Sequence, residues 1–340
     1  MKNTYYKYAK EIFNIHSPSG YTHNVILRIK ELLKELGFES EITNKGNLKV
    51  EVEGKDDKVV ATSAHVDTLG LMVRSITGNG ELKVTNLGGP LIPSLDGEYC
   101  IVKTRKGAEI SGTILSTSPS VHVFKDAATK PRDLDNIIIR LDEEVNSKKD
   151  VENLGIQNGD YVFIDPKFVI TQNDFIKSRF IDDKGSVCCL LTILEKISKK
   201  EIQLAHKTIF YFVVHEEVGH GAATVDDRIE EFVTVDMGCI GLDLAGSEYK
   251  VSIAAKDSGG PYDYELTTRL VDLANENNVD YVVDIFPFYG SDIGAAYRSG
   301  KDLKGALIGQ GVHASHGMER THLDGVLNTM KLLTLYLLNK

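Results

Sequence analysis

The pattern of apolar and polar positions changes twice along the chain and divides it into three parts. In the first part, apolar residues recur at helical spacing and are followed by a glycine. The apolar residues are Val25, Ile29, Leu32, Leu33 and Leu36, and the glycine is Gly37. This spacing predicts an amphipathic helix that stops at the glycine. Two strand-like runs follow, residues 48–52 and 59–64. The first part is therefore expected to form a helix and two strands.

The second part, residues 69 to 168, alternates short strand-like runs with turns. The runs cover residues 98–104, 109–115, 137–141 and 160–164, and glycine, proline and serine lie between them. Helical periodicity is weak here, and the pattern is typical of a small β-rich module.

Helices and buried strands alternate again after Arg179. An apolar stripe from Val187 to Ile197 predicts a helix, residues 208–214 and 232–235 predict buried strands, and residues 326–338 predict an apolar helix. Strands of this kind between helices are typical of an α/β sheet that is covered on both faces. We expect one catalytic domain from residues 1–68 and 174–340, with a β-rich domain, residues 69–173, inserted into it.

Length, charge and cysteine content narrow the class of protein. The 340 residues are 42% hydrophobic, which fits about two domains with a substantial core. The net charge of −10 argues against nucleic acid and anionic membranes as partners. The four cysteines show no CxxC spacing, so neither a disulfide framework nor a thiolate zinc site is indicated. No apolar run is long enough for a signal peptide or a membrane span, and we expect a cytoplasmic protein.

Acids and histidines gather in five short clusters, most of which follow a strand-like run. The clusters are His65 to Asp67, Asp182-Asp183, Glu216-Glu217, Asp236 and the stretch from His313 to His322. Zinc and hard divalent cations bind imidazole nitrogen and carboxylate oxygen, and two neighbouring cations need a carboxylate that both share. The clusters therefore predict a two-metal hydrolase.

Each cluster also has an explanation without metal. His-x-Asp is a weak motif, and an aspartate pair before a helix is a common cap. Two carboxylates at the end of a buried strand are harder to explain, because burial is costly unless they are paired or bound to metal. Three histidines within ten residues are unusual in a chain with ten in all. A metal site explains all the clusters together, whereas each explanation without metal accounts for only one of them.

The order of the motifs resembles that of a known family. HVDTLG is followed by RFIDDKG, HEEVGHGA, VDMG and ERTH, with GNL before them, LGGP and DNIIIRLDE in the insert, and GSD at residues 290–292. This resembles the tetrahedral and glutamyl aminopeptidases, binuclear metallopeptidases (family forty-two) that assemble into hollow particles. The resemblance implies a zinc-aminopeptidase-like domain with a mixed sheet sandwiched by helices. It also implies that the inserted domain is PDZ-like and forms dimer and oligomer contacts.

The resemblance assigns the metal ligands by position. It implies that His65, Asp182 and Asp236 bind one ion. Asp182 would be shared with a second ion that Glu217 and His322 complete.

The catalytic residues are assigned in the same way. Glu216 would be the general base, and Asp67 would orient His65. The resemblance also implies a cis peptide bond between Asp182 and Asp183.

The chain departs from the family around the last histidines. The family usually has a Ser/Pro stretch ending in an acid after the position of His322, whereas this chain has residues 323–325, Leu-Asp-Gly. His316 therefore competes with His322 as the last ligand. Further candidates for contacting the substrate or supporting the ligands are His316, His313, Asp183 and Arg320.

The resemblance implies an aminopeptidase that removes N-terminal residues from short peptides with a water bridging two metal ions. We expect two divalent cations per chain, zinc first and cobalt or manganese as alternatives. We also expect a homo-oligomer, a dodecamer built from dimers. A related amide hydrolase, such as a deacylase or carboxypeptidase, would not require a free N-terminus. A glycosidase of the endoglucanase type is disfavoured because the chain has no tryptophan for sugar stacking, and a non-enzymatic scaffold is disfavoured because every ligand position is filled.

Overall fold

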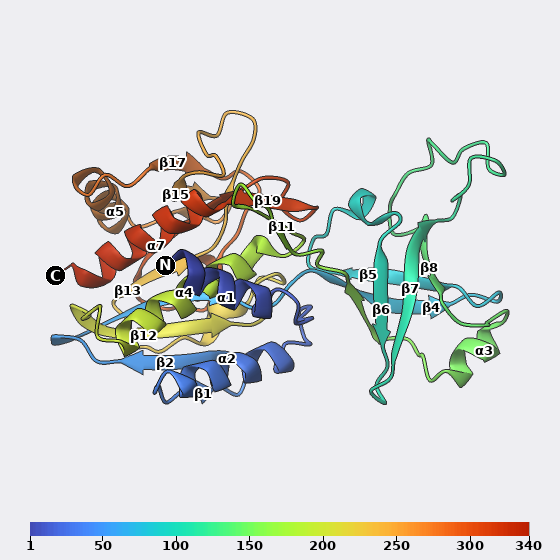
Figure 1. The fold of residues 1–340 in the computed structure, drawn as a ribbon, viewed down its shortest axis with the longest axis horizontal. Helices are drawn as coiled ribbons and strands as arrows, with labels where there is room; N and C mark the ends of the chain where they lie inside the picture. The colour runs from blue at the N-terminus through green and yellow to red at the C-terminus, as the bar shows by residue number, and fades with distance from the viewer. Residues whose placement is uncertain (340) are drawn as a thin grey trace. The chain divides into compact units, whose positions relative to one another are not determined.

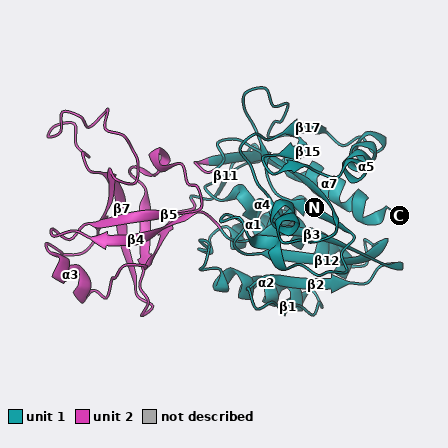
Figure 2. Cartoon of the chain, turned by 180° about the vertical axis from the view of Figure 1, so that it is seen from behind, with its two compact units in different colours: residues 1–67, 167–315, 319–340 teal, residues 68–166, 316–318 magenta. Residues whose placement is uncertain are grey.

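The structure, a computed structural model, describes residues 1–339 and divides into two compact units (Figures 1 and 2). Unit 1 comprises residues 1–67, 167–315 and those from 319 onward, and unit 2 comprises residues 68–166 and 316–318. The predicted boundary at residue 173 lies inside unit 1. The reason is that β10 (Val169–Ile170) pairs with β11 (Phe175–Ser178), which pairs with β19 (Glu319–His322) in a three-stranded sheet of unit 1.

Unit 1 contains the large sheet and most of the helices. Its helices are α1 (Lys2–Ile12), α2 (His23–Glu35), α4 (Ile181–Ser198), α5 (Tyr264–Glu276), α6 (Asp292–Arg298), α7 (Leu323–Leu338) and the 3-10 turn η2 (Gly221–Thr224). Its remaining strands are β1 (Glu41–Ile42), β2 (Leu48–Val52), β3 (Asp56–His65), β12 (His206–Val213), β13 (Glu231–Val235), β14 (Gly238–Cys239), β15 (Val251–Asp257), β16 (Gly260–Pro261), β17 (Tyr281–Ile285) and β18 (Lys304–Val312).

The large sheet is mixed, with its parallel strands at the centre. The strand order is β1-β2-β12-β3-β13-β18-β15-β16, and β12, β3, β13 and β18 run parallel. The neighbours β2 and β15 run antiparallel to β12 and β18, respectively. Helix α4 packs on β3, α7 packs on β18 and β15, and α6 packs on β13. The predicted mixed α/β fold is confirmed.

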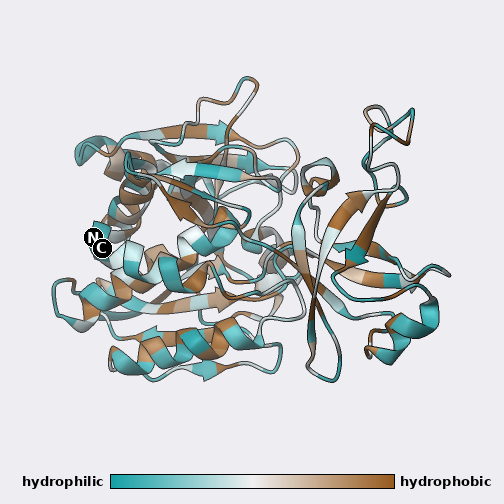
Figure 3. Cartoon of the chain, turned by 45° about the vertical axis from the view of Figure 1, so that its right-hand side comes forward, coloured by the Kyte–Doolittle hydropathy of each residue, from teal (hydrophilic) through white to brown (hydrophobic). Residues whose placement is uncertain are grey.

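The first predicted helix illustrates how the pattern forms an element. In α2, Val25, Ile29 and Leu33 are fully buried, while the intervening polar residues face solvent. The helices at the surface of unit 1 carry both hydrophilic and hydrophobic residues (Figure 3). Gly37 adopts a φ of +85° just after the helix, a conformation that favours glycine. The predicted helix and its stop are confirmed.

The parallel strands bring their carboxyl ends to one edge of the sheet. β3 ends at His65, β12 at Val213 and β13 at Val235. Residues that follow such strands meet at the same edge, which is where α/β sheets place their sites. Three of the five clusters therefore converge because of the sheet topology.

Unit 2 is a β-rich domain whose sheet closes on itself. Its elements are β4 (Gly70–Ile76), β5 (Leu82–Leu87), η1 (Ile92–Leu95), β6 (Tyr99–Lys103), β7 (Glu109–Ser116), β8 (Ile137–Leu141), α3 (Lys148–Asn153) and β9 (Tyr161–Ile164). The strands form a closed barrel in the order β4-β5-β8-β7-β6-β9. Alternate residues of β7, among them Ile110 and Ile114, fill the interior. The predicted β-rich module is confirmed, whereas the PDZ likeness is not.

No helix within residues 1–339 is long and apolar enough to cross a membrane. The cytoplasmic location stays a prediction.

Candidate metal centre

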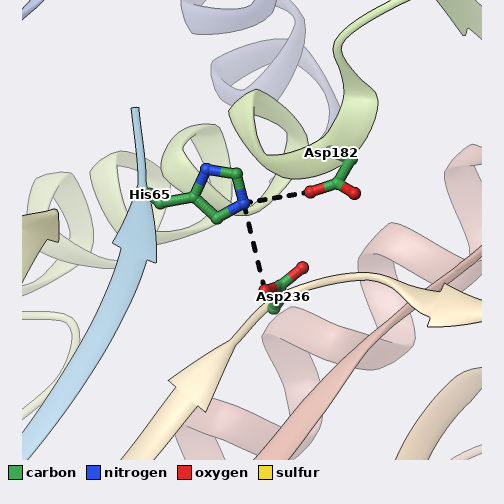
Figure 4. Close-up of side chains that lie close together, drawn as sticks. All are labelled: His65, Asp182 and Asp236. Atoms are coloured by element: carbon green, nitrogen blue, oxygen red, sulfur yellow. Dashed lines mark hydrogen bonds and ion pairs between the residues drawn. The ribbon is translucent and has the colours of Figure 1, made fainter. Parts of the chain in front are cut away.

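Three of the predicted ligands lie together at the carboxyl edge of the sheet. His65 ends β3, Asp236 follows β13, and Asp182 lies in the first turn of α4. The His65 ring points toward both acids, with its Nε2 3.0 Å from Asp182 Oδ1 and 3.9 Å from Asp236 Oδ2 (Figure 4). All three side chains are buried, and their ligand atoms lie within 4.8 Å of one another. The structure thus brings together the whole set predicted for one ion.

The turn that carries Asp182 is held by neighbouring acids. The peptide bond between Asp182 and Asp183 is cis, as the resemblance implies. Asp183 Oδ2 accepts a hydrogen bond from the backbone N–H of His65 at 3.0 Å. The backbone N–H of Asp182 donates to Glu319 Oε2 at 3.0 Å. Asp183 therefore supports a predicted ligand, and Glu319 is a site residue that the sequence reasoning missed.

Asp67 supports both His65 and the glutamate pair. His65 Nδ1 lies 2.9 Å from the backbone carbonyl oxygen of Asp67 and 3.7 Å from its carboxylate. The expectation that the carboxylate orients the ring is corrected, because the nearer group is the carbonyl. The carboxylate instead accepts from the backbone N–H groups of Glu216 and Glu217 at 3.0 and 3.3 Å, and from the hydroxyl of Ser19 at 2.5 Å.

Glu216 lies beside the imidazole in the loop after β12. Its Oε2 is 3.8 Å from His65 Nε2, and its side chain is only 14% exposed. Burial raises the pKa of Glu216 well above its ordinary value. The His65 charge opposes this rise, and the charges of Asp236 and Asp292 add to it. A carboxyl group whose pKa is raised toward neutrality is suited to accept a proton and release it again.

Asp292 is a second acid to which the sequence reasoning gave no role. It begins α6, accepts from the backbone N–H of Ala222 at 2.9 Å and from the Ser63 hydroxyl at 3.1 Å. Burial raises its pKa to about 6; the charge of His65 opposes this rise, and the charge of Asp67 adds to it. Its only signal in the sequence is the GSD motif at residues 290–292.

The electrostatics of the centre fit a divalent cation. Burial and the charge of Asp182 raise the pKa of Asp236 to about 7. The pKa of Asp183 is also raised, by burial and then by Asp236. Adjacent buried carboxylates repel one another when ionised, and a cation between them removes that penalty. One imidazole with several carboxylates is a donor set that divalent metals accept.

His322 does not lie at this centre, which corrects the prediction that it is the last ligand. Its Nδ1 accepts from the backbone N–H of Asp324 at 3.1 Å and so caps α7, while its Nε2 lies 3.0 Å from the carbonyl oxygen of Asn173. Its ring packs against Phe175 and Tyr249. Both ring nitrogens are therefore engaged by protein groups.

The alternation of side chains along β19 explains this placement. Glu319 and Thr321 are buried, whereas Arg320 and His322 lie on the other, half-exposed face. Successive strand residues point to opposite faces. Because Glu319 faces Asp182, His322 faces away from it.

Two further candidates also lie away from the centre. The Nε of Arg320 donates to Glu248 at 3.0 Å, and its guanidinium lies 4.5 Å from the ring centroid of Phe175. His313 is exposed, and its backbone pairs with that of Arg320. The role of each as a substrate contact stays a prediction.

His316 lies in the turn between β18 and β19, with a φ of +63°. Its Nδ1 is 2.9 Å from the carbonyl oxygen of Gly89. Ser315 and Glu319, on either side of the turn, belong to unit 1. His316 itself belongs to unit 2, as does its partner Gly89.

Comparisons with known proteins show the family to which the chain is related. The model of the M42 glutamyl aminopeptidase family matches residues 46–332. "Putative aminopeptidase YhfE" of Bacillus subtilis is 45% identical over 329 residues, which cover 96% of this chain and 95% of the relative. The lysyl aminopeptidase of Pyrococcus furiosus is 29% identical over 233 residues, covering 67% of this chain and 64% of the relative.

Solved structures share the fold over nearly the whole chain. A TET aminopeptidase from a marine sediment archaeon of the Thaumarchaeota superposes with a TM-score of 0.89 at 20% identity, covering 99% of this chain and 97% of its own. The TET1 peptidase of Pyrococcus horikoshii, described as assembling into a tetrahedron or a large octahedral shell, has a TM-score of 0.85 at 23% identity. It covers 99% of this chain and 100% of its own.

Proposed function

Because the chain belongs to the M42 glutamyl aminopeptidase family, we propose that its buried cluster is a two-cation centre that removes the N-terminal residue from short peptides. The protein is a peptide hydrolase, and metal dependence is implied by the family. The observation that carries the proposal is the convergence of His65, Asp182 and Asp236, with Glu216 beside them.

The proposed ligands divide into two sets that share Asp182. His65, Asp182 and Asp236 hold the first cation. Asp182, Glu217 and His316 are a second group of described residues able to hold an ion. The proposal assigns His316 in place of His322, since the ring nitrogens of His322 bond elsewhere. Zinc is the first expectation for the metal, and cobalt and manganese are alternatives with the same ligand preferences.

When held by these residues, the two cations would lower the pKa of the attacking water and polarise the scissile carbonyl. Glu216 takes a proton from the attacking water and returns it to the leaving amine. Asp67 fixes the position of Glu216 through the backbone N–H, and it orients His65 through its own carbonyl. Burial keeps bulk water away from these groups, which strengthens each electrostatic interaction.

A free amino terminus on the substrate distinguishes this function from that of a deacylase or carboxypeptidase. The centre is rich in carboxylates, so it favours a charged α-amino group over an acetylated one. We expect a short peptide to lose its first residue, and its N-acetylated form to be cleaved at least about 100-fold more slowly, which corresponds to about 3 kcal/mol. Mass spectrometry of timed digests measures both rates. Equal cleavage of the two peptides, or release of the C-terminal residue first, would exclude aminopeptidase specificity.

We also propose that the chain forms a homo-oligomer, a dodecamer built from dimers, with unit 2 in the subunit contacts. The support is the likeness to TET peptidases, one of which is described as a dodecamer. Closed symmetric assemblies are the usual form of homo-oligomers. We expect light scattering to give about twelve times the chain mass of 37.5 kDa. A native mass equal to one chain, with full peptidase activity, contradicts this.

A further inference from the structure

A single buried side chain, that of Asn47, joins the two ends of the loop that carries Glu216 and Glu217. The loop leaves β12 at Val214, whose backbone N–H donates to Asn47 Oδ1 at 2.9 Å. It returns at Gly221, whose carbonyl oxygen accepts from Asn47 Nδ2 at 3.3 Å. One amide group therefore closes residues 214–221 into a ring.

Asn47 is itself held firmly in place. It is 1% exposed and immediately precedes β2, which pairs with β12 so that Leu48 lies opposite Phe212. The backbone carbonyl of Asn47 accepts from Thr43 N–H at 2.8 Å. Gly46, with a φ of +107°, makes the turn that leads into Asn47. The sheet register thus places the amide beside the end of β12.

Other residues hold the loop at one end or at points between its ends. Asp67 holds the backbone N–H groups of both glutamates, and Lys45 Nζ donates to the carbonyl oxygen of Gly221 at 2.9 Å. Arg298 donates to the carbonyl oxygen of Gly219 at 3.0 Å. None of these four bonds joins the start of the loop to its end, whereas the Asn47 amide does.

We propose that Asn47 is a positioning residue that sets the place of the Glu216 carboxylate, an inference that rests on the proposed role of Glu216 as the base. The amide is suited to this task because it offers one acceptor and one donor at a fixed separation. Aspartate keeps the acceptor for Val214 N–H but turns a second oxygen toward the carbonyl of Gly221. Alanine removes both bonds. A base displaced by about 1 Å can cost about 100-fold in rate.

The test is a double-mutant cycle on the full-length protein. We expect Asn47→Ala to lower kcat about 100-fold, with KM changed less than about 3-fold and metal content near that of the parent. In a Glu216→Gln background, Asn47→Ala should cause no further loss, because the group that it positions is already gone. If Asn47→Ala does not fold, Asn47→Asp supplies the same comparison.

A matched control separates positioning from general stability. Asn277 donates from Nδ2 to the carbonyl of Leu273 at the end of α5. Asn277→Ala should lower the melting temperature and leave kcat unchanged. The proposal is overturned if Asn47→Ala keeps full kcat, or if it lowers kcat equally in both backgrounds. If Glu216→Gln alone keeps its activity, the proposed base is wrong, which is a different result from a failure of Asn47.

Discussion

Replacement of Glu216 by glutamine should lower turnover by about 10²–10⁴-fold while both cations stay bound. Glutamine has nearly the same shape but cannot accept the proton of the attacking water. The backbone bond from Glu216 N–H to Asp67 does not depend on the side chain and is retained. Glu216 is therefore expected to matter for proton transfer and not for metal affinity.

Steady-state kinetics at saturating metal, together with elemental analysis of the purified protein, check this expectation. Glu217→Gln is the matched control, because the same chemical change at the neighbouring residue should weaken the binding of one cation. Loss of metal in Glu216→Gln, with retention in Glu217→Gln, would show that the two roles have been exchanged.

His316→Ala should remove one of two cations per chain and most of the activity, whereas His322→Ala should keep both cations. The proposed second set is Asp182, Glu217 and His316, and the loss of one ligand from a small set leaves too few donors for tight binding. His322 caps α7 through Asp324 N–H, so its removal should cost about 0.5–2 kcal/mol of stability.

Metal stoichiometry after dialysis against a weak chelator distinguishes the two variants, and thermal unfolding reports the loss of the cap. A parent protein with one ion or fewer at saturating metal would refute the two-cation proposal. One ion lost from His322→Ala and none from His316→Ala would restore His322 as the last ligand.

Elements with continuous apolar or alternating patterns could be predicted from the sequence, and β18 could not. The prediction for residues 137–141 coincides with β8, and that for residues 48–52 coincides with β2. β18 contains Gly305, Gly309 and Gly311, which lower strand propensity. A Cβ at Gly309 would overlap the backbone carbonyl of Asp236. Gly309 thus weakens the strand pattern in the sequence, and the same residue leaves room for the turn that carries Asp236 to approach β18.

Site residues that belong to a motif after a strand could be predicted from the sequence. Site residues whose role depends on the direction of a side chain could not. His65, Asp182 and Asp236 follow from motif order. His65 and Asp236 converge through the parallel strands β3 and β13, and Asp182 joins them from the first turn of α4. Glu319 lies in the ERTH motif, but the motif does not reveal its role, because that role depends on which face of β19 points toward Asp182. The same alternation along β19 points His322 away from Asp182. Motif spacing alone does not reveal the direction of a side chain.

The hydrogen bond between Glu319 and Asp182 also has a consequence for protein synthesis. Glu319 comes 137 residues after Asp182 in the chain. Contacts between such distant segments form late, and domains generally fold in the order in which they leave the ribosome. A nascent chain that lacks β19 cannot hold the Asp182 turn in its final position. We therefore expect peptide hydrolysis to begin only after residue 319 has been made and has folded, which keeps an immature protease inactive beside other growing chains.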